Sequence, residues 1–174
     1  MKLLLTAVLF VMAISACNKQ DKTAPKYYFD LKSFFDKEAE NLNRISPLVL
    51  KKVQKNQQSE EKKIKISNWK NELELFKTSD LNKPAWKNSY TVQKQESKLI
   101  YLAKDPELRT RKVQIEFTEK GSVKNITINN EVNNSLYSSK EELIYYPDSL
   151  YRIVKEQTVR VLGDNFYRIQ GQIQ

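Results

Sequence analysis

The first regular pattern of apolar and polar positions begins after Asp30. Apolar residues recur there at steps of three and four, namely Leu31, Phe34, Phe35, Ala39, Leu42 and Ile45. Polar residues fill the positions between them, which is typical of a helix that packs one face on a core. Asp30 is a good N-cap, and Pro47 marks the end because proline disfavours helical geometry in the residue before it. The pattern predicts an amphipathic N-terminal helix.

A second, shorter helix is predicted from Asn68 to about Ser79, with Asn68 as its cap. Its apolar residues share one face: Trp69, Leu73 and Phe76. Between the two helices, residues 48–53 and 64–66 predict a weaker β-hairpin, whose connection is the polar stretch 54–61. Both helices are expected to pack on the same core.

Beyond Pro84 the helical period gives way to alternation of apolar and polar residues, which predicts strands. The alternating apolar residues are Val113, Ile115 and Phe117, then Tyr151, Ile153, Val159 and Val161, and finally Tyr167, Ile169 and Ile173. Turn residues separate these segments: Asp105-Pro106, Lys120-Gly121-Ser122, Pro147-Asp148-Ser149 and Gly163-Asp164-Asn165. Successive strands with one apolar face are typical of an antiparallel sheet that buries a single side.

These patterns predict an α+β fold in one domain, residues 27–174. The N-terminal amphipathic helix and the second short helix would pack on a curved antiparallel meander of about seven strands, which runs from about Tyr90 to the C-terminus. A small closed β-barrel is the alternative, because the sequence does not show whether the edges of the sheet meet.

The N-terminus follows a different pattern. Lys2 precedes an apolar run over residues 3–14, which ends in the small residues Ser15 and Ala16. This is the anatomy of a signal peptide, and the run is shorter than the roughly 20 apolar residues that a spanning helix needs. The sequence Ile14-Ser15-Ala16-Cys17 resembles the lipobox of bacterial lipoproteins. That resemblance implies that residues 1–16 are removed and that the thiol of Cys17 receives a diacylglyceryl group.

Cys17 is the only cysteine, so an exported chain has no second thiol for an internal disulfide. The two or three acyl chains of a bacterial lipoprotein hold a protein durably at a membrane. Residues 17–26 are polar and contain Pro25, which predicts a flexible tether. The alternative is a secreted protein in which Cys17 lies at the signal boundary by chance.

The bias toward lysine and asparagine, together with this layout, is similar to small lipoproteins of Bacteroidota, a likeness that implies no activity. Residues 18–22 carry a single acid, Asp21, whereas an acidic cluster would resemble the surface-export tag of some of these lipoproteins. We therefore expect a protein of the cell envelope, lipid-anchored in the outer membrane and facing the periplasm.

The net charge of +9 would favour nucleic acid as the partner of a cytoplasmic protein, but export excludes that partner. Anionic lipid head groups, lipopolysaccharide and acidic glycans remain as negative partners. The alternative is that a lysine-rich surface only keeps the protein soluble. The domain is expected to be a monomer.

The residue types of the chain exclude most catalytic chemistry. It has no histidine, and an acylated Cys17 offers no thiolate, so the usual triads, general bases and metal ligands are missing. Three scattered glycines cannot form a phosphate-binding loop. We expect a non-enzymatic protein without metal or cofactor, with a carboxylate-based, glycan-active hydrolase as a minor alternative. Glu141 and Glu142 do not form such a pair, because neighbours on a strand face opposite sides.

Two groups of residues are candidates for ligand contact. Arg109 and Arg111 have the same parity as Val113, so a regular strand would place them at the rim of the buried face, where they could bind an anionic head group. The alternative is that both are solvated. The second group could stack on sugars or line a lipid pocket, although packing in the core is the alternative; it includes Trp86, Tyr90, Tyr101, Tyr145 and Tyr146.

The expected function is that of a membrane-anchored envelope lipoprotein that holds an apolar or amphiphilic ligand beneath its helix. The layout is similar to the lipoprotein carriers and receptors of the LolA and LolB type, although no residue motif supports the likeness. The alternative is a structural or protein-interaction module of an envelope assembly. The two hypotheses differ in whether side chains fill the space between helix and sheet or leave an apolar cavity of several hundred cubic ångströms.

Overall fold

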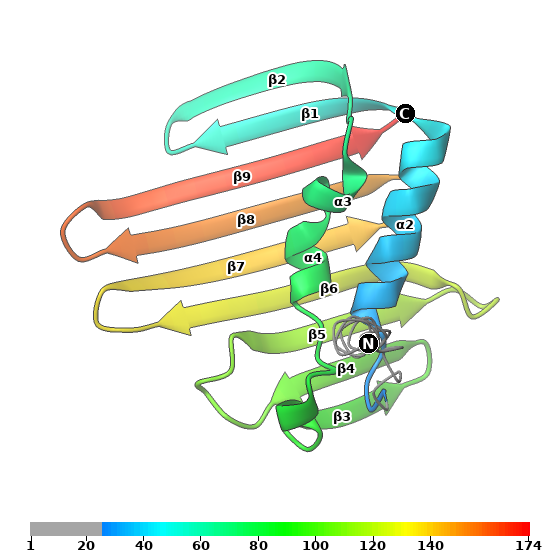
Figure 1. Cartoon of the computed structure of the whole chain (residues 1–174), viewed down its shortest axis with the longest axis vertical. Coiled ribbons are helices and arrows are strands. Elements are labelled where there is room, and N and C mark those ends of the chain that lie inside the picture. Colours follow the sequence, from blue (N-terminus) through cyan, green and yellow to red (C-terminus); the bar gives the residue numbers. More distant parts are fainter. Residues whose placement is uncertain (1–25) are drawn as a thin grey trace, which may run out of the picture.

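The computed structural model describes residues 26–174, which form one open antiparallel sheet with helices on one face (Figure 1). The predicted signal and the predicted tether up to Pro25, Cys17 included, lie outside the described residues. No helix within residues 26–174 is both long enough and apolar enough to cross a membrane.

The sheet contains nine strands in the spatial order β2-β1-β9-β8-β7-β6-β5-β4-β3. Their bounds are β1 Leu48–Lys55, β2 Gln58–Lys65, β3 Tyr90–Gln95, β4 Lys98–Ala103, β5 Thr110–Phe117, β6 Val123–Asn133, β7 Tyr137–Tyr146, β8 Leu150–Val159 and β9 Gly163–Ile173. From β3 on, each strand pairs with the next one in the chain. The β1–β2 hairpin joins the meander beside β9, where Val49 lies opposite Ile173. This hairpin brings the sheet to nine strands rather than about seven, and the sheet is open, which overturns the closed-barrel alternative.

Two turns differ from the sequence prediction. The first hairpin turns at Asn56 and Gln57, and its strands run through the polar stretch that was expected to connect them. All but one residue of β2 is exposed, so this strand has no apolar alternation that could reveal it. The last turn lies at residues 160–162, before Gly163 rather than after it, and Val161 is therefore in the turn and not on a strand.

The helices cross one face of the sheet. In α2 (Leu31–Ile45), Asp30 accepts a hydrogen bond from the backbone N–H of Ser33, and the helix ends at Ser46, whose φ is 46°. Its buried residues are Leu31, Phe35, Ala39 and Leu42. The expected second helix is divided into α3 (Trp69–Glu72) and α4 (Glu74–Thr78). Leu73 breaks it, because its φ of −97° and ψ of 8° leave the helical range, while its side chain is buried. A short turn of 3-10 helix, η2 (Pro84–Trp86), precedes β3.

Side chains fill the space between these helices and the sheet. The ring of Phe35 lies 5.0 Å from that of Phe76 and 5.1 Å from that of Tyr145. Trp69 packs edge-on against Tyr151 at 5.8 Å. All five rings are at most 1% exposed. This is the volume in which an apolar ligand was expected, and aromatic side chains occupy it.

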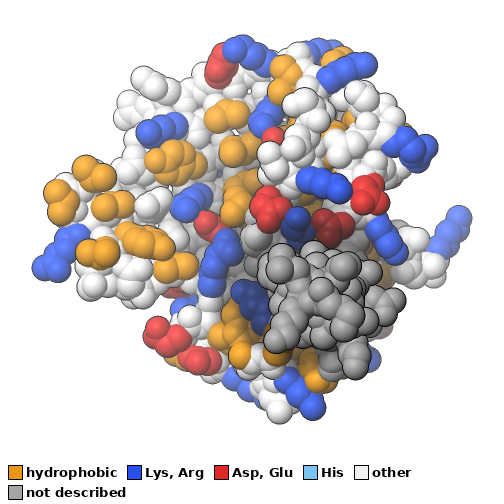
Figure 2. All heavy atoms as spheres, in the orientation of Figure 1, with side chains coloured by type: hydrophobic (Ala, Val, Ile, Leu, Met, Phe, Trp, Pro, Cys, Tyr) orange, Lys and Arg blue, Asp and Glu red, His pale blue; other side chains and the backbone are white. Residues whose placement is uncertain are grey.

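Hydrogen bonds also join the helices to the sheet. The Tyr145 hydroxyl donates to Glu38 Oε2 at 2.7 Å, and the Tyr151 hydroxyl donates to Glu72 Oε1 at 2.6 Å. Every buried hydrophobic residue of the core lies between Tyr28 and Ile153. The described residues therefore hold a core of their own. Figure 2 shows the helix side as spheres, with hydrophobic side chains left uncovered at the left, over the ends of β6–β9.

Candidate functional site: the open face of the sheet

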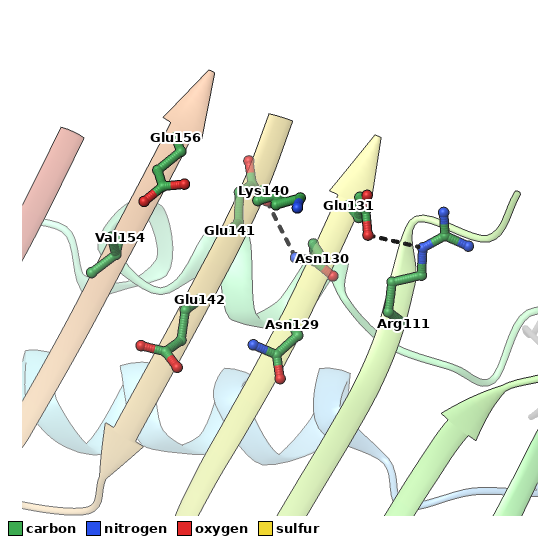
Figure 3. Close-up of a pocket in the computed structure, with 9 residues that line it drawn as sticks. All are labelled: Arg111, Asn129, Asn130, Glu131, Lys140, Glu141, Glu142, Val154 and Glu156. Carbon is green, nitrogen blue, oxygen red and sulfur yellow. Dashed lines mark hydrogen bonds and ion pairs between the residues drawn. The ribbon is translucent and has the colours of Figure 1, made fainter. Parts of the chain in front are cut away.

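The helices cover one face of the sheet, and the other face lacks a layer of secondary structure among residues 26–174. Figure 3 views this second face, which we call the open face, with α2 behind the strands. Alternation along the strands determines which side chains project from it. The central ones are Gln114, Thr127, Asn129, Glu131, Lys140, Glu142, Ile144, Tyr146, Arg152, Val154, Glu156, Phe166 and Arg168.

A hollow of about 300 Å³ lies at the centre of the open face. Two rows of cross-strand neighbours line it. The first row is Asn129, Glu142 and Val154, and the second is Glu131, Lys140 and Glu156. Arg111 closes one side, with its Nε 3.8 Å from an oxygen of Glu131.

The charges of this hollow alternate in sign. Lys140 lies between Glu131 and Glu156 in the strand register, an arrangement in which opposite charges on neighbouring strands stabilise each other. Asn130 and Glu141 also border the hollow, but they belong to the helix side, where they bond to each other (Figure 3). The three glutamates that face outward outnumber the two cations, so the hollow does not favour an anion. It can accept hydrogen bonds from the amide or cationic groups of a partner.

Apolar and arginine side chains adjoin the hollow. Ile144 lies opposite Arg152, and Val154 lies opposite Arg168. The Arg168 guanidinium lies over the Phe166 ring at 5.3 Å. Tyr146, at the end of β7, is 39% exposed. Tyrosine, phenylalanine and arginine are enriched where proteins bind one another.

Arg109, the first candidate from the sequence, is paired within the chain on the helix side. Its guanidinium lies 2.8 Å from Glu141 Oε2, and Lys155 Nζ lies 3.2 Å from Oε1 of the same carboxylate. Burial by itself raises the pKa of Glu141, but the hydrogen bond and charge of Arg109 and the charge of Lys155 outweigh burial and leave the pKa below its ordinary value. Glu142 follows it in the strand and projects from the opposite face, so the two glutamates form no pair.

Arg111 does not share a face with Arg109, because the register shifts between Thr110 and Lys112. This bulge places Thr110, which is 1% exposed, in the buried row instead of either arginine. Arg111 donates to the carbonyl of Asp105 at 3.2 Å, in addition to its contact with Glu131. Both arginines still border one hollow of about 400 Å³ at the ends of β5 and β6. Each has a partner in the chain, and contact with a ligand stays a prediction.

The aromatic candidates pack around Tyr28. Tyr90 and Tyr101 are each 4% exposed, and both rings meet that of Tyr28 edge-on at 5.4 Å. The Tyr90 hydroxyl donates to the carbonyl of Thr110 at 2.9 Å. Trp86 is partly buried, and the ammonium group of Lys83 lies 3.9 Å from the centre of its ring. These side chains fasten the segment before α2 to β3 and β4, and burial leaves Tyr90 and Tyr101 little surface for a ligand.

Sequence reasoning missed the open face as a site. Its members are scattered over five strands, and only the register brings Asn129, Glu142 and Val154 into one row. Comparison of the chain with protein-family models, with curated proteins and with solved structures gives no match.

Proposed function

We propose that the protein is a membrane-tethered, non-enzymatic interaction module of the bacterial envelope, which binds a partner protein through the open face. The observation that carries this proposal is the contrast between the two faces of the sheet. On the helix side, an apolar ligand would have to displace Phe35, Phe76 and Tyr145, which are fully packed. The open face carries apolar, tyrosine and arginine side chains that no helix within residues 26–174 covers.

The energetics favour a partner on this face. Burial of apolar surface contributes about 25 cal/mol for each Å² removed from water. Ile144, Val154 and Phe166 are only partly buried by their neighbours, so a partner would remove their remaining apolar surface from water. Arg152 projects from the same face opposite Ile144, so its guanidinium offers hydrogen-bond donors to a partner that supplies an acceptor.

The tether rests on the lipobox-like sequence that ends at Cys17. Replacement by Cys17→Ser in the producing bacterium removes the thiol that would carry the lipid. The protein is then expected to leave the membrane fraction and to lose the mass of the acyl chains. A variant that stays membrane-bound at the unchanged mature mass would contradict the anchor.

The open face is tested separately by placing a photoreactive phenylalanine analogue at Tyr146 in the producing bacterium. Irradiation is expected to yield a discrete cross-linked protein, and Arg152→Glu in the same chain should reduce its yield at least fivefold. The matched control carries the analogue at Ile45, which is 48% exposed at the end of α2. Equal adducts from both positions, or none from Tyr146, would contradict the proposal.

A further inference from the structure

Three hydrophobic side chains are far more exposed than any others described. They are Leu136 at 72%, Leu162 at 79% and Val161 at 90%. Leu136 lies in the turn between β6 and β7, and the other two lie in the turn between β8 and β9. The backbone N–H of Arg160 donates to the carbonyl of Leu136 at 3.1 Å, which joins the two turns. We call these three residues the apolar tip; both turns lie at the left end of the sheet in Figure 1.

Hydrogen bonds fix both turns. Asn134 Oδ1 accepts from the backbone N–H groups of Leu136 and Tyr137, at 2.9 and 3.0 Å. The N–H of Leu162 donates to the carbonyl of Val159 at 3.0 Å, and Gly163 supplies the φ of 77° that follows this turn. The backbone therefore holds the three side chains outward. Removal of apolar side chains from water is favourable, and the fold of the chain leaves most of that gain unused at all three positions.

The shape and size of the apolar tip fit a lipid surface better than a protein. The tip is made of two projecting turns, and the hollow beside it is lined mainly by polar residues such as Asn133, Ser138 and Thr158. A stable protein interface covers about 800 Å² on each partner, which three side chains cannot supply. Shallow entry into the boundary between head groups and acyl chains needs only a few apolar side chains.

The surroundings of the apolar tip match that boundary. Tyr137 follows Leu136, and tyrosine is enriched at the interface between membrane and water. Arg160 precedes Val161 and is exposed, so its charge can meet a lipid phosphate. The net charge of the chain, +9, attracts it to anionic lipid.

We propose that the apolar tip inserts shallowly into an anionic lipid bilayer, as a membrane contact separate from the lipid on Cys17. The inference rests on the membrane location proposed above but not on lipidation.

The test uses the chain from Asn18 to Gln174, which contains the whole described core and no lipid. Vesicles of phosphatidylglycerol and phosphatidylethanolamine are sedimented with this chain. The parent chain is expected to bind, and the variant Leu136→Ser, Val161→Ser, Leu162→Ser should bind at least tenfold more weakly. Circular dichroism verifies that the variant is folded. The control Ile45→Ser, at an exposed apolar residue remote in sequence from both turns, should bind like the parent chain.

A second measurement locates the contact. The chain from Asn18 has no cysteine, so Leu162→Cys accepts a single environment-sensitive dye. Its emission is expected to shift to the blue on vesicles, whereas a dye at Ile45→Cys should not respond. Absence of vesicle binding by the parent, equal binding by the serine variant, or no shift at residue 162 would overturn the proposal. Self-association of the parent without vesicles, lost in the serine variant, would also overturn it by assigning the apolar tip to contact between copies. The result of the Cys17→Ser experiment does not affect this test, because the tested chain begins at Asn18 and lacks Cys17.

Discussion

Glu141 and Glu142 are neighbours in β7 with opposite surroundings. Glu141 is 8% exposed and accepts hydrogen bonds from Arg109 and Asn130, whereas Glu142 is exposed on the open face. Because the pKa of Glu141 lies below its ordinary value of 4.5, this carboxylate stabilises the fold above that pH. The stabilisation is lost as the pH falls through the lowered pKa.

At the residue scale, we predict that Glu141→Gln lowers the free energy of unfolding by roughly 2 kcal/mol at pH 7, because two buried charge-assisted hydrogen bonds lose their acceptor charge. Urea denaturation measures the effect. The difference from the parent chain should shrink as the pH falls below 4.5 and through the lowered pKa, since Glu141 then takes up a proton in the parent as well. The neighbouring Glu142→Gln should stay within about 0.5 kcal/mol of the parent, and equal losses in both variants would contradict the assignment.

The two edge strands of the sheet carry backbone N–H and C=O groups that no neighbouring strand within residues 26–174 pairs. β2 and β3 are the edges of the sheet, and an edge strand offers unpaired backbone groups to other chains. On β2, the charged run Glu60, Glu61, Lys62 and Lys63 is exposed on both faces. Charged side chains at an edge oppose pairing with a second sheet. This protection explains why β2 is charged although it contributes almost nothing to the core.

At the element scale, we predict that threonine at residues 60–63 makes the chain self-associate, because threonine favours strands and removes the charges. Light scattering at increasing concentration measures this. The control Lys52→Thr, Gln54→Thr alters β1, which is paired on both sides and should not change the scattering. A β2 variant that stays monodisperse would show that the charges do not protect this edge.

Sequence patterns predict those features that depend on local periodicity. The alternation around Val113, Tyr151 and Tyr167 follows from strands with one buried side, and these residues lie in β5, β8 and β9. The pattern fails where an extra residue in a strand shifts the alternation to the other face. It also fails where a strand has no buried side and so shows no alternation. The bulge at Arg111 and the exposed strand β2 are examples. The open face depends on register between strands distant in the sequence, and register is set by packing rather than by local propensity.

At the scale of the whole molecule, the helices and the sheet share one core within residues 28–153. We therefore predict that the chain from Asn18 unfolds in one cooperative transition. Its melting temperature should lie within about 3 °C of that of the chain purified in detergent from the membrane of the producing bacterium, because the described core begins at Tyr28. Differential scanning calorimetry measures both chains. Two separate transitions, or a clearly lower melting temperature of the chain from Asn18, would contradict a self-contained domain.

The pairing of β1 with β9 has a consequence for how the chain matures. Val49 in β1 pairs with Ile173 in β9, near the C-terminus. The β1–β2 hairpin is synthesised first, so the other edge of β1 stays unpaired until β9 has been made. Contacts this far apart in the sequence form late, since the intervening chain must first be ordered. A chain broken off before β9 would leave β1 and β8 without their common neighbour. Chaperones and proteases would then meet two open strand edges that β9 otherwise covers.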